Sequence, residues 1–176
     1  MKKETRFETK LSKIGPLTIL RLPKSASAIL PSRGVAMVEG TINSRNFQAA
    51  LEPDGKGSHW FSLDKEMLRS IKSDVGNLVT LNISPAKEWV EVDVPADFKK
   101  ALKTNPQANS LWKEITPINR WDWMRWLRST KNADTRKKRI DTAISMLKAG
   151  KGRRCCFNRS ECTVPDVSHK GILLEK

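Results

Sequence analysis

Residues 35–51 read VAMVEGTINSRNFQAAL and organise the N-terminal half of the chain. Residues 35–42 are rich in apolar and β-branched side chains, which predicts a strand, and residues 47–51 predict a second strand. The four residues between them, Asn43-Ser44-Arg45-Asn46, have the polar side chains that favour a turn. We therefore expect two consecutive strands joined by a turn.

Segments on both sides of this pair also have the character of strands. They are bounded by turn signals such as Ile14-Gly15-Pro16 and Pro53-Asp54-Gly55-Lys56-Gly57, where glycine supplies positive φ angles. Asp64 is placed to cap a short helix over 65–71. The further strands expected are 7–11, 17–22, 59–63, 78–83 and, as the last one, 88–94. Many short strands without βαβ spacing predict a small barrel or sandwich.

After Pro95 the spacing of apolar residues changes from 2 to 3.6, which is typical of helices. Thr116 and Pro117 have the residue types of an N-cap and a first helical position, and a last helix is expected from near Asn132 to a terminating Gly150. The expected helices contain residues 98–102, 108–115, 121–127 and 140–147. The chain is thus expected to be an α+β protein with a helical half of three to four helices.

The periodicity divides the chain into three parts. A small β-barrel domain is expected over 1–94 and a helical region over 95–150. Residues 151–176 form a basic tail with all three cysteines; they show no periodicity, and we expect them to be poorly ordered.

Composition excludes several classes of protein. The chain has 176 residues, long enough to bury a core without a disulfide or a metal. No stretch approaches the roughly eighteen apolar residues of a membrane span, and no apolar signal segment follows residues 1–6. Three cysteines, an odd number, do not make a disulfide framework. We therefore expect a cytoplasmic protein.

Positive charge is the most unusual bulk property. Lys and Arg number 33 against 19 Asp and Glu, a net charge of +14 with a pI near 10.0. Residues 120–159 hold 13 basic and 3 acidic side chains, a net +10. Such a concentrated field favours a polyanion, either nucleic acid or an anionic lipid surface. The alternative is that the charge serves solubility.

A basic and aromatic stretch is the leading candidate site. Guanidinium groups hold phosphates, and exposed indoles such as Trp123 and Trp126 stack on bases. The alternative is that these indoles pack in the core and the arginines form a solvated face. The candidate cations are Arg120, Arg125, Arg128, Lys131, Arg136, Lys137, Lys138 and Arg139.

Two other groups of residues have side chains suited to a site. His59 and Trp60 follow a glycine-containing loop, which predicts either an anion-binding pocket or, more simply, a histidine satisfied by backbone groups. Cys155, Cys156 and Cys162 with His169 lack the spacing of a zinc site and are expected to be reduced thiols. We find no signature of an enzyme, a metal site or a cofactor.

The order of elements resembles two known bacterial regions. The stretches FETKL (7–11), GVAMVEGTIN (34–43) and LDKEMLR (63–69) are similar to a small β-barrel domain of unknown function. The helical half resembles the YdeI/OmpD-associated, or bacteriocin-protection, family. The resemblance rests on the stretches VPADF (94–98), RWDWMRWL (120–127), DTRKKRI (134–140) and the ending GKGRRCCF (150–157). Asn43-Ser44 and Gly76-Asn77 depart from the usual Asn-Gly and Gly-Asp turns.

The resemblance implies a double-split barrel of the kind shared by AbrB- and MazE-like transcription factors. It implies no catalytic residues, since the family has none established, and its names come from genetic associations with stress and bacteriocin resistance.

We therefore expect a monomeric, non-enzymatic binding or stress-protection protein whose helical half contacts a polyanion, nucleic acid in preference to lipid. The alternative is a small-molecule or protein-partner site, with or without catalytic activity, at the loop near His59.

Overall fold

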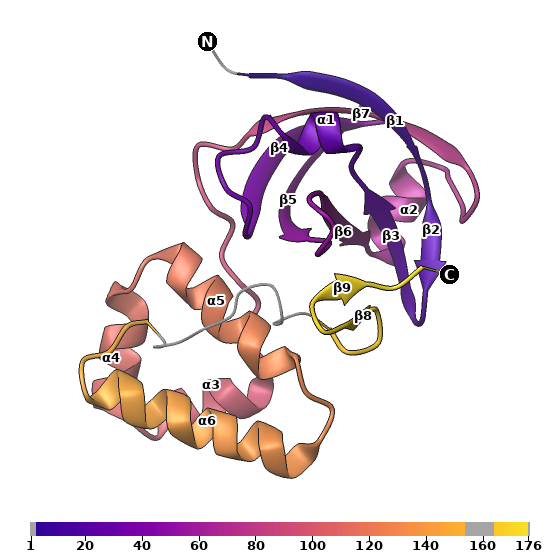
Figure 1. The fold of residues 1–176 in the computed structure, drawn as a ribbon. Helices are drawn as coiled ribbons and strands as arrows, with labels where there is room; N and C mark the ends of the chain where they lie inside the picture. The colour runs from indigo at the N-terminus through magenta and orange to yellow at the C-terminus, as the bar shows by residue number, and fades with distance from the viewer. Residues whose placement is uncertain (1–2, 154–163, 176) are drawn as a thin grey trace. The chain divides into compact units, whose positions relative to one another are not determined.

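The computed structural model describes residues 3–153 and 164–175, and the chain divides into two compact units (Figure 1). Unit 1 comprises Met1–Val90 and Asp166–Lys176, and unit 2 comprises Glu91–Pro165. Unit 1 is built on an antiparallel sheet and unit 2 on helices, which confirms the α+β prediction. Among the described residues, no helix is both long and apolar enough to cross a membrane.

The described part of unit 1 holds a seven-stranded antiparallel sheet in the order β1-β7-β4-β5-β6-β3-β2. All the strands predicted before residue 85 are present, and β2 is an addition. Their bounds are Thr5–Lys10 (β1), Ser12–Ile14 (β2), Leu17–Arg21 (β3), Ala36–Ile42 (β4), Arg45–Pro53 (β5), His59–Leu63 (β6) and Leu78–Pro85 (β7).

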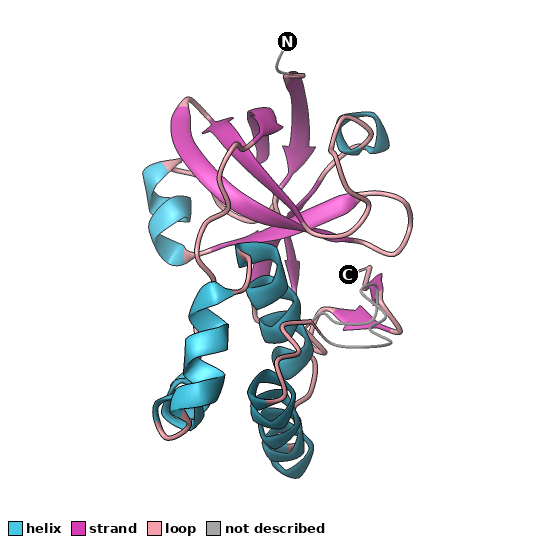
Figure 2. Ribbon diagram, turned by 90° about the vertical axis from the view of Figure 1, so that its left-hand side faces the viewer, coloured by secondary structure: helices cyan, strands magenta, loops and turns pink. Residues whose placement is uncertain are grey.

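The sheet must curl, because its two edge strands are consecutive in the chain. Strands β1 and β2 stand at opposite edges, yet the single residue Leu11 separates them. Leu11 is fully buried, and its backbone exchanges hydrogen bonds with Gly76 and Asn77 next to β7. Figure 2 shows the resulting curl of the strands, which is consistent with the predicted small barrel.

The β4–β5 hairpin is tighter than the sequence predicted. Ile42 pairs with Arg45, so the connection has two residues, Asn43 and Ser44, instead of four. Both have positive φ, 45° and 64°, as a hairpin turn that matches strand twist requires. Asn43 tolerates this conformation, and its side-chain oxygen accepts a hydrogen bond from the Thr80 backbone N–H at 3.0 Å.

Two short helices flank the sheet. Helix α2 (Lys65–Ser70) begins at the predicted cap, because the Asp64 carboxylate accepts a hydrogen bond from the Met67 N–H at 2.7 Å. Helix α1 (Lys24–Ser27) was not predicted; it is a single turn that buries Ala26 and Ser27.

The predicted last strand, residues 88–94, is wrong. These residues are all described and lie outside any strand. The alternating pattern has another cause: Val92 and Val94 pack against the core of unit 2 as the chain enters the helices. The alternation indicates an extended segment with one buried side. Sequence alone does not distinguish such a segment from a paired strand.

Part of the tail is ordered, where the sequence predicted none. Strands β8 (Ser168–His169) and β9 (Ile172–Leu173) form a small hairpin in unit 1. Val167 and Leu173 are buried, and the Leu173 N–H donates to the Asp54 carbonyl at 3.0 Å. Two apolar anchors are too few to produce a periodic pattern, so the hairpin escaped prediction.

The described part of unit 2 holds four helices, the upper number predicted. They are α3 (Ala96–Lys103), α4 (Pro106–Glu114), α5 (Pro117–Arg128) and α6 (Ala133–Lys148). The predicted Thr116 cap is confirmed, because its side chain accepts a hydrogen bond from the Asn119 N–H. The last helix begins beside Asn132 as expected, and the structure adds that the Asn132 side chain caps it by accepting from the Thr135 N–H. Gly150 follows α6 with φ of 78°.

Candidate functional site

Helix α5 is central to unit 2, which changes how the basic and aromatic stretch must be interpreted. Its six consecutive residues from Asp122 to Leu127 are all buried. A helix buried all round has no solvated face. The structure therefore places Arg125, a predicted phosphate ligand, entirely out of solvent with 0% exposure.

Arg120 caps the C-terminal end of helix α4. Its Nη1 donates to the carbonyl oxygens of Trp112, Lys113 and Ile115 at 3.2, 3.3 and 2.6 Å. Its Nη2 lies 2.6 Å from a carboxylate oxygen of Glu91. A cation at a helix C-terminus satisfies carbonyls that lack helical partners and opposes the dipole. This guanidinium thus has a structural role.

Arg139 has a similar role at the end of helix α5. Its Nη1 donates to the Trp126 carbonyl at 2.5 Å and to the Ser129 hydroxyl at 2.7 Å. Its guanidinium also lies over the Trp126 ring, 5.2 Å from the centroid, which is a cation–π distance. Arg136 pairs with Asp97, and Arg128 is half-buried.

The lysines of the predicted stretch are placed differently. Lys131, in the loop before α6, and Lys137 and Lys138, on α6, are all exposed. Of the eight predicted cations, these three present their side chains most openly to solvent. Lysine is a strongly hydrated point charge, so its exposure costs nothing in packing.

The two tryptophans of the stretch lie in the core. Trp123 is 2% exposed and Trp126 is 7% exposed, and their rings meet edge to face at 5.9 Å. The Trp123 indole N–H donates to the Gly152 carbonyl at 3.0 Å. Both indoles are therefore used in packing, which matches the core interpretation rather than base stacking.

His59 and Trp60 are also buried, at 1% and 2% exposure. The His59 ring lies 2.6 Å from the Ser27 hydroxyl through Nδ1 and 2.8 Å from the Gly34 carbonyl through Nε2. Burial lowers the pKa of His59 below its ordinary value of 6.5, against the opposing effects of the Gly34 hydrogen bond and the Asp54 charge. The imidazole is satisfied inside unit 1, as expected of a structural histidine.

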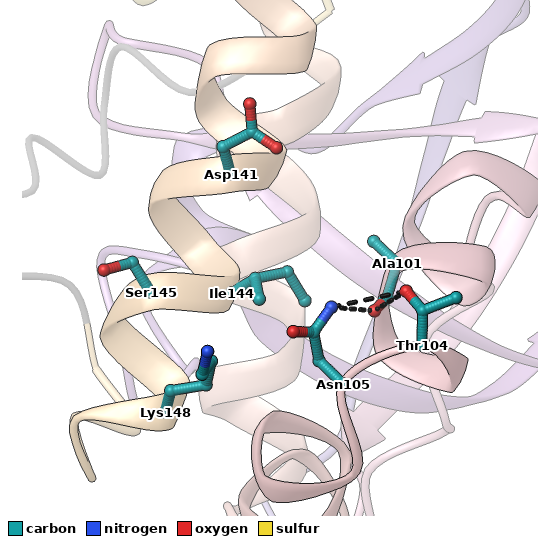
Figure 3. A pocket seen from close by; sticks show the side chains of 7 residues that line it. All are labelled: Ala101, Thr104, Asn105, Asp141, Ile144, Ser145 and Lys148. Atoms are coloured by element: carbon teal, nitrogen blue, oxygen red, sulfur yellow. Dashed lines mark hydrogen bonds between the residues drawn. The ribbon is translucent and has the colours of Figure 1, made fainter.

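Helices α3 and α6 of unit 2 line a pocket of about 430 Å³ (Figure 3). The end of α3 contributes Ala101, Thr104 and Asn105. The Asn105 amide nitrogen donates to the Ala101 carbonyl at 2.9 Å, which fixes the side chain. Helix α6 contributes Asp141, Ile144, Ser145 and Lys148. The pocket thus combines an apolar floor with both signs of charge.

Comparison with known families agrees with this architecture. Residues 91–150 match the family described as bacteriocin-protection, YdeI or OmpD-associated, and residues 7–83 match a domain of unknown function, DUF1905. The helical half of the chain is thus similar to the YdeI/OmpD-associated family. No curated protein matches the chain. Both regions recognised from sequence motifs are thereby confirmed, while the finer likeness to AbrB- and MazE-like barrels stays a prediction.

The region that matches the YdeI/OmpD-associated family carries further basic residues outside the predicted stretch. Lys99, Lys100 and Lys103 are exposed on helix α3, whose buried side chains are Phe98 and Leu102. The pattern FKKALK contained the signal, because lysines alternate with core residues at helical spacing. The longer basic run at 136–139 dominates the charge profile and obscures this shorter signal.

The cysteines and His169 complete the predicted site residues. Cys155, Cys156 and Cys162 lie outside the described residues. His169 is exposed in strand β8. Within residues 3–153 and 164–175, no three His, Cys, Asp or Glu side chains are grouped closely enough to hold a metal ion.

Proposed function

We propose that this protein is a non-catalytic binding protein whose helical unit contacts a polyanion, with nucleic acid preferred over lipid. The observation that carries the proposal is the charge exposed on residues 91–153. The exposed acids there are Glu91, Asp93, Asp97, Glu114, Asp134 and Asp141. The exposed cations are Lys99, Lys100, Lys103, Lys113, Lys131, Lys137, Lys138, Lys148, Lys151 and Arg153.

The imbalance is larger than these two sets suggest. Glu91 and Asp97 are paired with Arg120 and Arg136, neither of which belongs to the exposed cations. The exposed cations therefore outnumber the remaining exposed acids by more than two to one. A surface of this composition attracts polyanions and releases their counterions on contact.

The chemistry of the exposed groups favours binding without sequence specificity. Nine of the ten are lysines, which contact phosphates as point charges, whereas most of the planar arginines that recognise bases in two-point fashion are buried or half-buried. With Trp123 and Trp126 buried, base stacking on these two indoles has no support. We expect affinity that depends on salt and little on sequence.

The test is a titration of the whole protein with single- and double-stranded oligonucleotides at several salt concentrations. Wild type should give a linear fall of log affinity with log salt. Each phosphate contact contributes roughly 0.7–0.9 to the slope, so K137Q/K138Q should flatten it by about 1.5.

The matched control removes two exposed lysines from unit 1. K65Q/K72Q changes the net charge equally but should leave the slope close to wild type. An unchanged slope in K137Q/K138Q, or absence of binding by wild type at low salt, contradicts the proposal. If the protein binds heparin more tightly than either oligonucleotide, the preference for nucleic acid is contradicted.

The proposal also includes a cytoplasmic location, a single copy of the chain and a role in stress protection. What supports the single copy is that strands β1 and β2, at opposite edges of the sheet, are joined through Leu11 within one chain. What supports the location is that the proposed ligand class is abundant there.

A further inference from the structure

We propose that the pocket between helices α3 and α6 binds a short zwitterionic peptide of about three residues. The pocket shares Lys148 with the exposed cations of the polyanion proposal, whereas Lys137 and Lys138, which the oligonucleotide test replaces, are not among its lining residues. The pocket holds about 430 Å³, a volume within the range of small-ligand sites. Its lining residues, labelled in Figure 3, supply complementary groups for the two ends and the backbone of such a peptide.

The two charges of the pocket lie on one face of helix α6. Asp141 and Lys148 are seven residues apart, close to two helical turns, so both side chains project on the same side. Both are exposed, and neither makes an ion pair within the described residues. A carboxylate and an ammonium group held apart in this way favour a ligand with both charges over a simple ion.

The distance along the helix sets the length of the ligand. Seven residues at 1.5 Å each separate the two backbone positions by roughly 10 Å. An extended chain advances about 3.3–3.6 Å per residue, so three residues span the same length. The charges of a single amino acid lie far too close together to reach both groups at once.

The opposite wall recognises the peptide backbone. In Figure 3 the Asn105 side-chain oxygen faces helix α6, while its nitrogen is held by the Ala101 carbonyl and the Thr104 hydroxyl. That oxygen accepts no hydrogen bond from any described residue. It is therefore oriented to accept a hydrogen bond from a peptide N–H lying in the pocket.

The floor between the charges is apolar and small. Ile144 lies between Asp141 and Lys148 along α6 and is 8% exposed, and Ala101 faces it from α3. In the proposed complex the ligand's ammonium contacts Asp141, its carboxylate contacts Lys148, and small side chains cover Ile144. Peptides with small apolar side chains should be preferred.

The test uses trialanine and two blocked forms, N-acetyl-trialanine and trialanine amide. Binding is followed by NMR as changes in the backbone amide signals of Asn105 and Ile144. Trialanine should bind wild type roughly two- to fivefold more tightly than either blocked form, the effect of one exposed charge pair. Free alanine should bind more weakly than all three.

Two variants assign each end of the peptide. D141N should bind trialanine and the acetylated form equally, and K148Q should bind trialanine and the amide equally. The control variants D134N, on the same helix, and K65Q, on α2, remove equivalent charges outside the pocket and should keep both preferences.

Several results would overturn the inference. The first is that wild type binds free and blocked peptides equally. The second is that the control variants no longer distinguish free from blocked peptides. The third is that millimolar trialanine leaves the amide signals of Asn105 and Ile144 unchanged. The D141N variant distinguishes failure of this inference from failure of the polyanion proposal. D141N removes a negative charge, so oligonucleotide binding should be kept or strengthened while recognition of the peptide ammonium is lost.

Discussion

The Arg136 guanidinium and the Asp97 carboxylate form a two-point ion pair that joins helix α6 to helix α3. Nε lies 2.5 Å from Oδ2, and Nη2 lies 2.9 Å from Oδ1. The remaining nitrogen, Nη1, donates to the Leu127 carbonyl in the last turn of α5 at 3.0 Å. One arginine of the basic stretch thus connects three helices of unit 2.

The first prediction concerns the pH dependence of this pair. The hydrogen bond from Arg136 holds the pKa of Asp97 below its ordinary value of 3.8. The pair therefore stabilises the fold above pH 3.8, and its contribution is lost as the pH falls through the lower pKa of the folded state. Asp97→Asn should cost about 1 kcal/mol near neutral pH, because the pair is partly exposed.

The measurement is urea unfolding of wild type and Asp97→Asn near pH 7 and near pH 3. The difference between the two proteins should shrink at acid pH. Asp93→Asn, a neighbouring exposed acid, is the matched control and should leave stability within about 0.5 kcal/mol at both values. A difference that is constant with pH would show that the charge of Asp97 is irrelevant.

The second prediction separates two adjacent residues of the basic run. Arg139→Gln removes the hydrogen bonds to Trp126 and Ser129 and the cation–π contact, and should cost about 1–2 kcal/mol. Lys138→Gln should change stability by less than about 0.5 kcal/mol. Arg139→Gln thus has the larger effect on stability, whereas Lys138→Gln should have the larger effect on oligonucleotide binding. Lys138→Gln should lower the salt slope and Arg139→Gln should not. If one of the two variants had the larger effect in both the stability and the binding assay, this division of roles would be contradicted.

The local chemistry of the sequence was enough to predict most of the fold. Strands follow from apolar runs between turn residues, and helix starts follow from single capping side chains such as Asp64 and Thr116. These signals depend on contacts within a few residues of the chain. The failure at 88–94 has the same origin, because alternation indicates one buried side without saying what buries it.

The candidate site could not be predicted in the same way. A run of arginines has the same appearance whether its guanidinium groups meet phosphates or the carbonyl oxygens at the ends of neighbouring helices. Arg120 and Arg139 do the latter, and only the packing of α4, α5 and α6 reveals it. The pocket at Asn105 likewise requires that α3 and α6 be adjacent, which no local pattern encodes.

The third prediction concerns His59. Burial lowers its pKa, so below pH 6.5 the unfolded chain takes up a proton that the folded chain excludes. Stability should fall as the pH drops below 6.5, by at most about 1.4 kcal/mol per pH unit, and level off below the lower pKa of the folded state. His59→Gln should be less stable at neutral pH and lack this slope. His169→Gln, which alters the exposed histidine, should retain it in urea unfolding at several pH values.

The fourth prediction tests the close approach of strands β4 and β7. A Cβ atom on Gly40 would lie 1.9 Å from the backbone oxygen of Asn82, a position that flexible side-chain motion cannot relieve. Gly40→Ala should therefore force the strands apart and cost about 3 kcal/mol or more in thermal or urea unfolding. Gly57→Ala is the informative comparison, since a Cβ there meets nothing within 4 Å and only its positive φ of 89° is unfavourable. That variant should cost about 1 kcal/mol. Equal losses in the two variants would mean that backbone conformation, and not the spacing between β4 and β7, requires glycine at position 40.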